Sequence, residues 1–206
     1  MTHHVLETPV SEAQVRALKA GDTVTLEKTL FGIRDATLIA MFDHGRTTRF
    51  DLKGHAVVHT APNVRKIDPR PGNSCPYEPV CIGTTTSMRM ERFTRPLMER
   101  DGVRVIIGKG GMGPGTLAAL RDIGGVYLAV VGGAAALETT WIEAIEDVDM
   151  DDLHPESLWK FRITHFGPLL VTMDSHGGSL HADVNATATA RRAAILAKLG
   201  AAERPA

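Results

Sequence analysis

Three cationic side chains stand at glycine-containing turns, each between a segment with the pattern of a strand and one with the pattern of a helix. They are Arg34, Arg89 and Lys109. In open α/β sheets, ligands bind outside the carboxyl ends of the strands, so these turns converge if their strands are neighbours. Arginine grips a carboxylate through two parallel hydrogen bonds, and lysine adds a point charge. Three cations around one pocket, with the threonines at residues 84–86 beside them, suit a small dicarboxylate. The alternative is that the arginines pair with Asp and Glu on the surface.

The turn that carries Lys109 is rich in glycine and lies between an apolar strand pattern at residues 103–107 and a helical pattern at residues 116–123. Glycine lets backbone N–H groups approach a ligand, and a helix N-terminus favours negative charge, so we expect an anion there. Gly108-x-Gly110-x-x-Gly113 also matches the dinucleotide fingerprint and leaves a Rossmann-like NAD(P)-dependent oxidoreductase as an alternative. That motif needs a carboxylate after the next strand, and residues 132–134 provide none. A tight turn with a solvated lysine is the remaining interpretation.

Four residues near the C-terminus have side chains that bind metals, namely Asp174, His176, His181 and Asp183. Their spacing is unspecific, and histidines hydrogen-bonded to backbone near a turn are the favoured interpretation. The acidic run at residues 146–152 predicts a solvated connection, with calcium as the minor alternative, although it lacks the spacing of an EF-hand.

The two cysteines, Cys75 and Cys81, form no disulfide framework and are too few to hold an iron–sulfur cluster by themselves. We expect a cytoplasmic location. The formal net charge of −1 provides no basic field, so nucleic acid and membranes are not expected partners.

Hydrophobic residues make up 43% of the 206 residues and charged residues 23%, which is typical of a globular protein with one sizeable core. Strand patterns alternate with helical patterns along the chain, so the fold class is α/β and we expect a single domain over residues 1–206. Strands are predicted at residues 22–30, 55–60, 103–107, 126–131, 160–164 and 168–173. Helices are predicted at residues 10–18, 34–42, 88–100, 116–123, about 132–145 and 188–199. The proline-rich residues 61–79 are expected to be irregular.

Several short motifs, taken together, resemble the C-terminal half of class I iron–sulfur fumarases, which also occurs as the β subunit of two-subunit fumarases and L-tartrate dehydratases. The matching motifs follow one another in the same order as in the family, from residue 34 to residue 184. The family-like core covers about residues 10–200. The matching segments are Arg34-Asp35-Ala36, Asp51-Leu52-Lys53-Gly54, Thr85-Thr86-x-x-Arg89-Met90, Gly108-Lys109-Gly110-Gly111-Met112, Gly132-Gly133-Ala134-Ala135-Ala136-Leu137 and residues 171–184.

The resemblance implies a swivelling β/β/α domain and a hydro-lyase that reversibly removes water from a 2-hydroxy dicarboxylate. It also implies a cysteine-bearing α subunit that holds a [4Fe–4S] cluster, whose open iron binds the substrate as a Lewis acid. By position, Arg34, Arg89 and Lys109 would bind the substrate carboxylates and Thr85 would be the catalytic base. A threonine hydroxyl is a poor base unless another group takes its proton, and the resemblance puts that acidic group in the α subunit.

The chain departs from the family pattern around the threonines. Thr84 replaces a proline, and Ser87-Met88 replace the usual Ala-Gly before Arg89. Met88 is bulkier than the glycine that it replaces. The resemblance therefore leaves open whether the substrate is fumarate, tartrate or mesaconate. Subunit stoichiometry is open too, although we expect the isolated chain to self-associate or to bind the α subunit. A non-catalytic anion-binding subunit that keeps this fold is a further alternative.

Overall fold

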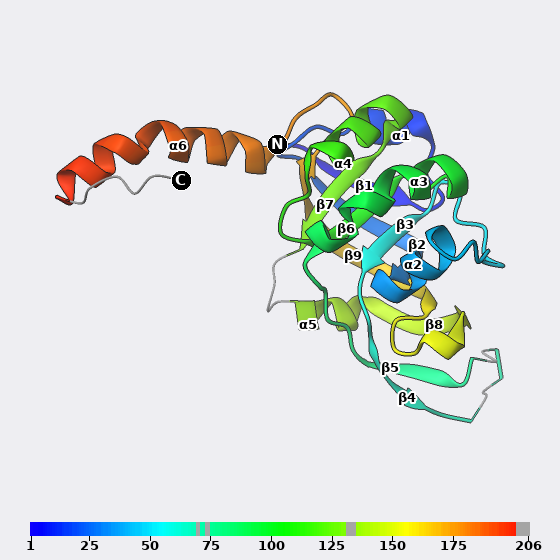
Figure 1. Cartoon of the computed structure of the whole chain (residues 1–206). Coiled ribbons are helices and arrows are strands. Elements are labelled where there is room, and N and C mark those ends of the chain that lie inside the picture. The colour runs from blue at the N-terminus through cyan, green and yellow to red at the C-terminus, as the bar shows by residue number, and fades with distance from the viewer. Residues whose placement is uncertain (69–70, 73–74, 131–134, 201–206) are drawn as a thin grey trace.

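The computed structural model of the chain describes residues 1–68, 71–72, 75–130 and 135–200. Most of its strands form one mixed sheet, with helices packed on one side (Figure 1). In sheet order, the strands are β1 (His3–Glu7), β2 (Thr23–Ile33), β3 (Ala56–His59), β6 (Val105–Lys109), β7 (Val126–Val130), β9 (Leu158–Met173) and β8 (Ile142–Asp149). A separate hairpin pairs β4 (Asn63–Lys66) with β5 (Tyr77–Cys81).

Six α-helices are described, and most of them are joined to the strands by short turns. They are α1 (Glu12–Arg16), α2 (Asp35–Phe42), α3 (Glu91–Asp101), α4 (Pro114–Ala119), α5 (Ala135–Glu138) and α6 (Leu180–Lys198). A 3₁₀ turn, Ser87–Met90, leads into α3, and a π turn, Leu120–Gly124, continues α4. Helix α1 begins with a capping box, in which the Ser11 side chain accepts a hydrogen bond from the Gln14 backbone N and the Gln14 side chain accepts one from the Ser11 backbone N.

The sheet closes on itself through β9. Strands β1, β2, β3, β6 and β7 are parallel to one another. Strand β9 runs antiparallel to both β7 and β2, so β2, β3, β6, β7 and β9 form a closed circuit of pairings. Because β2, β3, β6 and β7 point the same way, their carboxyl ends meet at one edge of the sheet. We call this edge the carboxyl edge.

Alternating side chains of the strands pack into two hydrophobic cores. Val105 and Ile107 point into the core enclosed by the sheet, together with residues of β9 such as Phe161. Ile106 points to the other side, where it packs against α3 residues such as Phe93. Successive residues of a strand face opposite sides of a sheet, so one continuous apolar run serves both cores. This result confirms the α/β class.

The predicted helix over about residues 132–145 is wrong in its second half. Residues 132–134 lie outside the described residues, α5 ends at Glu138, and β8 begins at Ile142. Ile142 and Ile145 pair with Ile163 and Phe161 of β9, which buries both isoleucines. Their spacing fits a helix or a strand, and pairing with β9 decides between the two.

Other differences from the sequence predictions arise from pairing that local patterns do not reveal. The two strands expected at residues 160–164 and 168–173 are one strand, β9, because both halves pair with β2. Strand β1 lacks a clear alternation and is held by pairing with β2. Residues 61–79 contain most of the β4–β5 hairpin. Helix α6 begins eight residues earlier than predicted, at Leu180, where the Ser179 side chain caps it.

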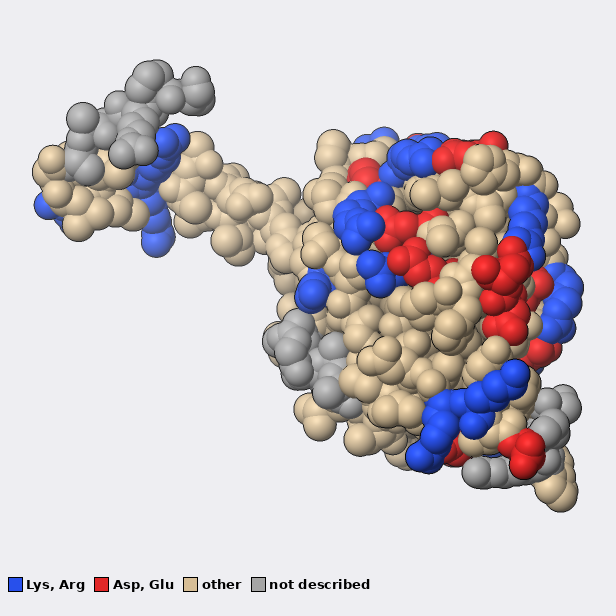
Figure 2. Space-filling view, turned by 60° about the horizontal axis from the view of Figure 1, so that its bottom comes forward, with Lys and Arg blue, Asp and Glu red and all other residues tan. Residues whose placement is uncertain are grey.

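Helix α6 projects away from the body of the molecule (Figure 1), and none of its residues is buried. Among the described residues, no helix is long and apolar enough to cross a membrane. On the face shown in Figure 2, acidic and basic side chains are interspersed over the body, in agreement with the small net charge.

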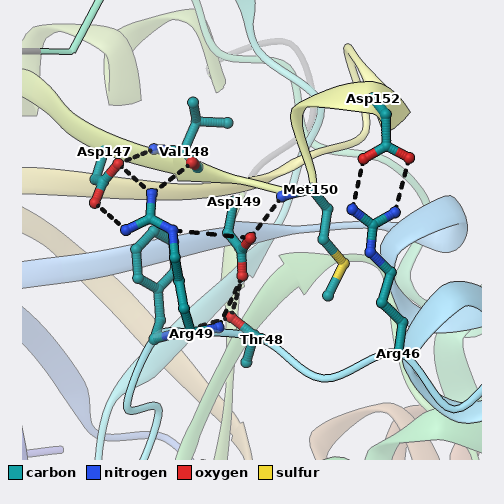
Figure 3. Close-up of polar contacts among 9 residues, drawn as sticks. Arg46, Thr48, Arg49, Asp147, Val148, Asp149, Met150 and Asp152 are labelled. Atoms are coloured by element: carbon teal, nitrogen blue, oxygen red, sulfur yellow. Dashed lines mark hydrogen bonds and ion pairs between the residues drawn. The ribbon is translucent and has the colours of Figure 1, made fainter.

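The acidic run at residues 146–152 is not a simple solvated connection, because it is the site where the loop after α2 attaches to β8. Arg49 forms a bidentate ion pair with Asp147, and Arg46 forms one with Asp152 (Figure 3). Asp149 accepts hydrogen bonds from Thr48 Oγ1 at 2.7 Å and from the backbone N of Arg49 at 2.9 Å. In the described part of the chain, no cluster of three or more acidic, cysteine or histidine side chains could hold a metal ion.

Asp149 should therefore make stability depend on pH. Burial raises its pKa, but hydrogen bonds from Thr48, Arg49 and Met150 outweigh burial, and the pKa lies below its ordinary value. A lowered folded-state pKa gives stability that is present above the unfolded-state pKa of about 4 and is lost as the pH falls through the folded-state pKa. We expect Asp149→Asn to lower the free energy of unfolding by about 1–2 kcal/mol at pH 7 and to flatten its fall in acid.

Urea denaturation from pH 7 to pH 2.5 measures this effect. Asp152→Asn is the matched control, because it removes an exposed ion pair of the same loop and should change the pH profile less. Equal profiles for wild type and Asp149→Asn would show that this carboxylate does not contribute to acid sensitivity.

Candidate active site

Arg34 and Arg89 meet at one carboxylate on the carboxyl edge. Arg34 Nε lies 3.3 Å from Asp35 Oδ2, and an Arg89 guanidinium nitrogen lies 3.2 Å from Asp35 Oδ1. Arg34 Nε also lies 3.3 Å from Glu156 Oε1. The side chain of Arg34 is 25% exposed and that of Arg89 is 54% exposed, so both remain open to a ligand. The arginines do pair with acidic side chains, as one alternative predicted, but the shared carboxylate brings them together.

The chain reaches Arg34 directly from β2, in extended conformation, and α2 begins at the next residue. Gly32 precedes it because a Cβ there would lie 2.7 Å from the ring of Phe161. Glu156 Oε2 accepts a hydrogen bond from the Ala36 backbone N at 2.8 Å, so the same carboxylate caps the start of α2. Backbone packing and capping thus fix the position of Arg34.

The threonine segment, residues 84–86, is held between β3 and β6. Thr84 forms an isolated bridge with Thr60, just past β3, and Thr86 forms one with Lys109. The three side chains differ in exposure: Thr84 is buried, Thr85 is half-buried and Thr86 is exposed. The buried Thr84 hydroxyl has no hydrogen-bond partner among the described residues. Thr85 and Thr86 are therefore the hydroxyls of this segment that a ligand can reach.

Lys109 is the last residue of β6 and is half-buried at the same edge. Within the described part of the chain it forms no ion pair. Gly110 follows with a φ of +79°, a conformation that favours glycine and turns the chain away from the strand. The bridge to Thr86 brings Lys109 next to the threonine segment. The structure therefore places all four sequence-predicted site residues, Arg34, Thr85, Arg89 and Lys109, on one edge.

The sequence predicts an anionic ligand at the helix after the glycine turn, but the anion that the structure shows there is a side chain of the protein. Glu91 accepts hydrogen bonds from Gly113 N and Thr116 N, both at 2.8 Å, and from Thr116 Oγ1 at 2.6 Å. A Cβ at Gly113 would lie 2.7 Å from Glu91 Oε1. The position that a dinucleotide phosphate would need is therefore occupied, which argues against the Rossmann-like oxidoreductase.

The residues that suggested a metal site near the C-terminus have other roles. Asp174 accepts hydrogen bonds from the backbone N of Ala20, His176 and Gly178. Burial raises the pKa of Asp174, but these bonds outweigh it and lower the pKa. His176 Nε2 lies 2.8 Å from the Arg16 carbonyl oxygen. His181 packs on the glycine turn, where a Cβ at Gly111 would lie 2.9 Å from its ring.

Cys75 is buried in the sheet-enclosed core and Cys81 is half-buried in β5. Burial raises the pKa of the Cys75 thiol, which disfavours the thiolate that binds a metal. The side chains of this chain therefore do not fit an iron–sulfur cluster, and we derive no chemical step through one.

The Asp-Leu-Lys-Gly motif lies away from the carboxyl edge. Gly54 has a φ of +73° and donates a hydrogen bond to Gly102 O at 2.8 Å, just before β3 begins. A cavity of about 560 Å³ lies there, lined by residues 10–12, 50–54, 99–102 and 104. Leu52 is buried, so this motif supports the fold at the opposite edge.

Sequence reasoning missed three residues that hold the site. They are Asp35, which both arginines share as a partner, and the two helix-capping residues Glu91 and Glu156. Asp35 directly follows Arg34, and that adjacency was the available signal. Glu91 and Glu156 cap helices across 22 to 120 residues of sequence, and no local pattern indicates such pairs.

The comparisons with known proteins agree with this arrangement. The sequence model of the family described as Fumarase C-terminus matches residues 2–184. The chain is 37% identical over 196 residues to L(+)-tartrate dehydratase subunit beta of Escherichia coli (strain K12), which covers 95% of this chain and 94% of the relative. It is 34% identical over 181 residues to the putative L(+)-tartrate dehydratase subunit beta of Methanocaldococcus jannaschii, with 85% and 90% covered.

A putative fumarate hydratase class I of Geobacillus stearothermophilus is 41% identical over 180 residues, which is 87% of this chain and 34% of that protein. The family match spans most of the chain, and these relatives share more than 30% identity with it. The family resemblance inferred from short motifs is thus confirmed. The chain belongs to the Fumarase C-terminus family.

Proposed function

We propose that the chain is the β subunit of a two-subunit hydro-lyase, of fumarate hydratase or tartrate dehydratase type, that reversibly removes water from a 2-hydroxy dicarboxylate. Relatives named as tartrate dehydratase β subunits match over nearly their whole length. The relative named as a fumarate hydratase is much longer than this chain. A catalytic unit divided between two chains accounts for both observations, and the partner is a cysteine-bearing α subunit that carries the [4Fe–4S] cluster.

One structural observation carries this proposal: Arg34 and Arg89 share a single carboxylate, that of Asp35. Their guanidinium groups are therefore already arranged around a group of the same chemistry as one end of the substrate. Lys109 adds a cation that the described residues leave without an ion pair. Arg34 and Arg89 are paired with the carboxylates of Asp35 and Glu156, so Lys109 is the cation of this set that remains available to a ligand. A dicarboxylate would be attracted to this edge and held by charge-assisted hydrogen bonds.

In this proposal the arginines and Lys109 bind and orient the substrate carboxylates, and Thr85 acts at the carbon next to the one that bears the hydroxyl. Removing water breaks the C–H bond of that carbon and the C–OH bond of its neighbour. The proton and the hydroxide together make up the water that is lost, and a double bond remains between the two carbons. The Thr85 oxygen can accept the carbon's proton only as its own proton passes to another base. The family resemblance puts that base in the α subunit, and within the described residues no carboxylate or imidazole is hydrogen-bonded to the Thr85 hydroxyl.

The proposal includes a fold label and a location. A sheet enclosing one core, with helices over a second core on its outer side, is compatible with a swivelling β/β/α domain, and we propose a single domain of that type over residues 1–206. Cys75 and Cys81 form no disulfide in the described structure, which supports a reducing, cytoplasmic compartment.

The partner provides the first test. We expect the purified chain to be colourless and inactive, and co-expression with a cysteine-bearing α chain to yield a brown, oxygen-sensitive complex. That complex should interconvert fumarate and malate, or dehydrate tartrate, in a spectrophotometric assay. Turnover by this chain alone, with a cluster reconstituted on it, would contradict the two-subunit arrangement. A stable complex that binds dicarboxylates without turnover would indicate the non-catalytic alternative.

The cations provide the second test. Arg34→Met, Arg89→Met and Lys109→Met remove a charge and keep most of the apolar stem. We expect each variant complex to lose about 2–5 kcal/mol in kcat/KM, mainly through a higher KM, because a substrate carboxylate is left without its partner. Arg92→Met is the matched control, since Arg92 is an exposed arginine paired with Asp43 on the same side of the molecule as α2 and α3. Unchanged KM in all three site variants would exclude them as substrate ligands.

Thr85 should respond differently. Thr85→Val keeps the shape and removes the hydroxyl, so we expect kcat to fall by roughly 10²-fold or more with KM little changed, the scale for loss of an acid–base group. Thr84→Val and Thr86→Val are the controls on either side, assayed in the same complex at equal cluster content. Thr86 is the more demanding control because its side chain is exposed. If Thr86→Val abolishes turnover and Thr85→Val does not, Thr86 carries the reactive hydroxyl.

A further inference from the structure

A buried hydrogen bond lies directly beneath the threonine segment. His59, the last residue of β3, is 2% exposed, and Ser87, two residues after Thr85, is fully buried. His59 Nδ1 lies 2.9 Å from Ser87 Oγ. The roles assigned to the site residues above use neither side chain. A polar pair that is buried among apolar residues is costly unless its hydrogen bond forms, so the bond specifies one arrangement of the two residues.

His59 holds the threonine segment at two points. Its carbonyl oxygen accepts a hydrogen bond from the Thr85 backbone N at 3.1 Å. Its ring is bonded to the Ser87 hydroxyl. The backbone from Thr85 to Ser87 is therefore attached to one residue at both of its ends, and the Thr85 side chain emerges from the attached stretch.

The residues next to the Ser87 hydroxyl leave room for it. A Cβ at Gly108 would overlap Ser87 Oγ and would lie 3.0 Å from the Tyr127 hydroxyl. The Tyr127 hydroxyl donates a hydrogen bond to Gly110 O at 2.9 Å, on the turn that follows Lys109. The missing side chain at Gly108 thus makes room for Ser87, while Tyr127 braces the turn that carries Lys109.

The protonation states of His59 and Tyr127 are compatible with a His59–Ser87 hydrogen bond that persists around neutral pH. Burial lowers the pKa of His59 to about 4, and the charge of Asp35 only partly opposes this shift. Burial raises the pKa of Tyr127 to about 12, against a smaller effect of Ser87. The imidazole and the phenol are therefore both neutral near pH 7, and the His59–Ser87 bond does not compete with a titration there.

We propose that His59 and Ser87 form a positioning pair that fixes the backbone of residues 85–87, and with it the orientation of the Thr85 hydroxyl toward a substrate bound by Arg34, Arg89 and Lys109. The inference rests on the proposed function for its catalytic consequence and on the structure for the pair itself.

Ser87→Ala should separate orientation from binding. In the α/β complex we expect kcat to fall on the order of 10-fold, because a small displacement of a reactive group costs rate. KM should stay within about twofold, because Arg34 and Lys109 lie on other elements and Arg89, in the same turn as Ser87, keeps its pairing with Asp35. His59→Leu should have the same effect, and His59→Asn should restore much of the rate, since an asparagine amide can bond to Ser87 from the position of Nδ1. The double variant Ser87→Ala/His59→Leu should be no slower than the slower single variant.

Amide hydrogen exchange of the isolated chain tests the pair without any catalytic assay. Ser87→Ala should lower the protection of the Thr85 amide at least tenfold and leave β6 protected. Ser175→Ala is the matched control, because Ser175 is a buried serine in the turn after β9 whose hydroxyl has no partner among the described residues. It should change neither exchange at Thr85 nor kcat.

The outcomes distinguish this inference from the proposed function. A wild-type complex without hydro-lyase turnover would overturn the proposed function, and hydrogen exchange would still decide whether the pair fixes the segment. An active wild type with unchanged kcat and unchanged Thr85 protection in Ser87→Ala would overturn the positioning pair. The positioning pair would also be overturned if the fold-losses in kcat of the two single variants multiplied in the double variant. Two residues that act through one hydrogen bond cannot lose that bond twice.

Discussion

The antiparallel pairing of β9 with both β2 and β7 is the constraint on which the rest of the structure depends. It closes the sheet, so the inner face of every parallel strand becomes one core and the outer face must be covered by helices. Once the sheet is closed, β2, β3, β6 and β7 cannot shift in register without disrupting both cores. The carboxyl edge is consequently a fixed ring of strand ends, and the residues that follow those ends inherit its geometry. A cation placed one residue after such a strand is positioned by the fold rather than by its own loop.

Electrostatics at that edge is organised by internal carboxylates. Glu91 and Glu156 accept backbone N–H hydrogen bonds at the N-termini of α4 and α2, so an anionic ligand at either helix would compete with a side chain. Recognition of an anion is left to side chains, and Asp35 keeps Arg34 and Arg89 close together despite their like charge. Like charges held together in the absence of ligand would otherwise repel and separate. In the proposed function, a substrate carboxylate would find the two guanidinium groups already near each other, and little ordering of those side chains would be required on binding.

The sequence predicted the class of fold more completely than it predicted the elements near the C-terminus. Glycine-containing turns after apolar runs are local signals, so the closeness of Arg34 and Lys109 could be inferred from the rule for parallel strands. Arg89 instead follows β5 of the separate antiparallel hairpin, and it lies at the edge through its pairing with Asp35. Ile142 and Ile145 carry a spacing that suits helix or strand, and only the position of β9 decides between them. Asp147 and Asp149 read as a solvated run because Arg49, about 100 residues earlier, is what pairs with them. His59 and Ser87 likewise meet through tertiary structure, and neither residue stands out in the sequence.

The charge at the carboxyl edge also explains why this chain needs a partner for the proposed chemistry. A substrate with two carboxylates brings two negative charges, whereas Arg34 and Arg89 are already paired with carboxylates and only Lys109, of the three cations, has no ion pair within the described residues. The second carboxylate must therefore be neutralised by groups outside this chain, or it must displace Asp35 from an arginine. Displacement would leave the Asp35 carboxylate without part of its compensation in a half-buried position, which is unfavourable. Neutralisation from the α subunit avoids that cost. In the proposed function it would also place one end of the substrate among groups that this chain lacks, and the choice between fumarate, tartrate and mesaconate would then be shared between the two subunits.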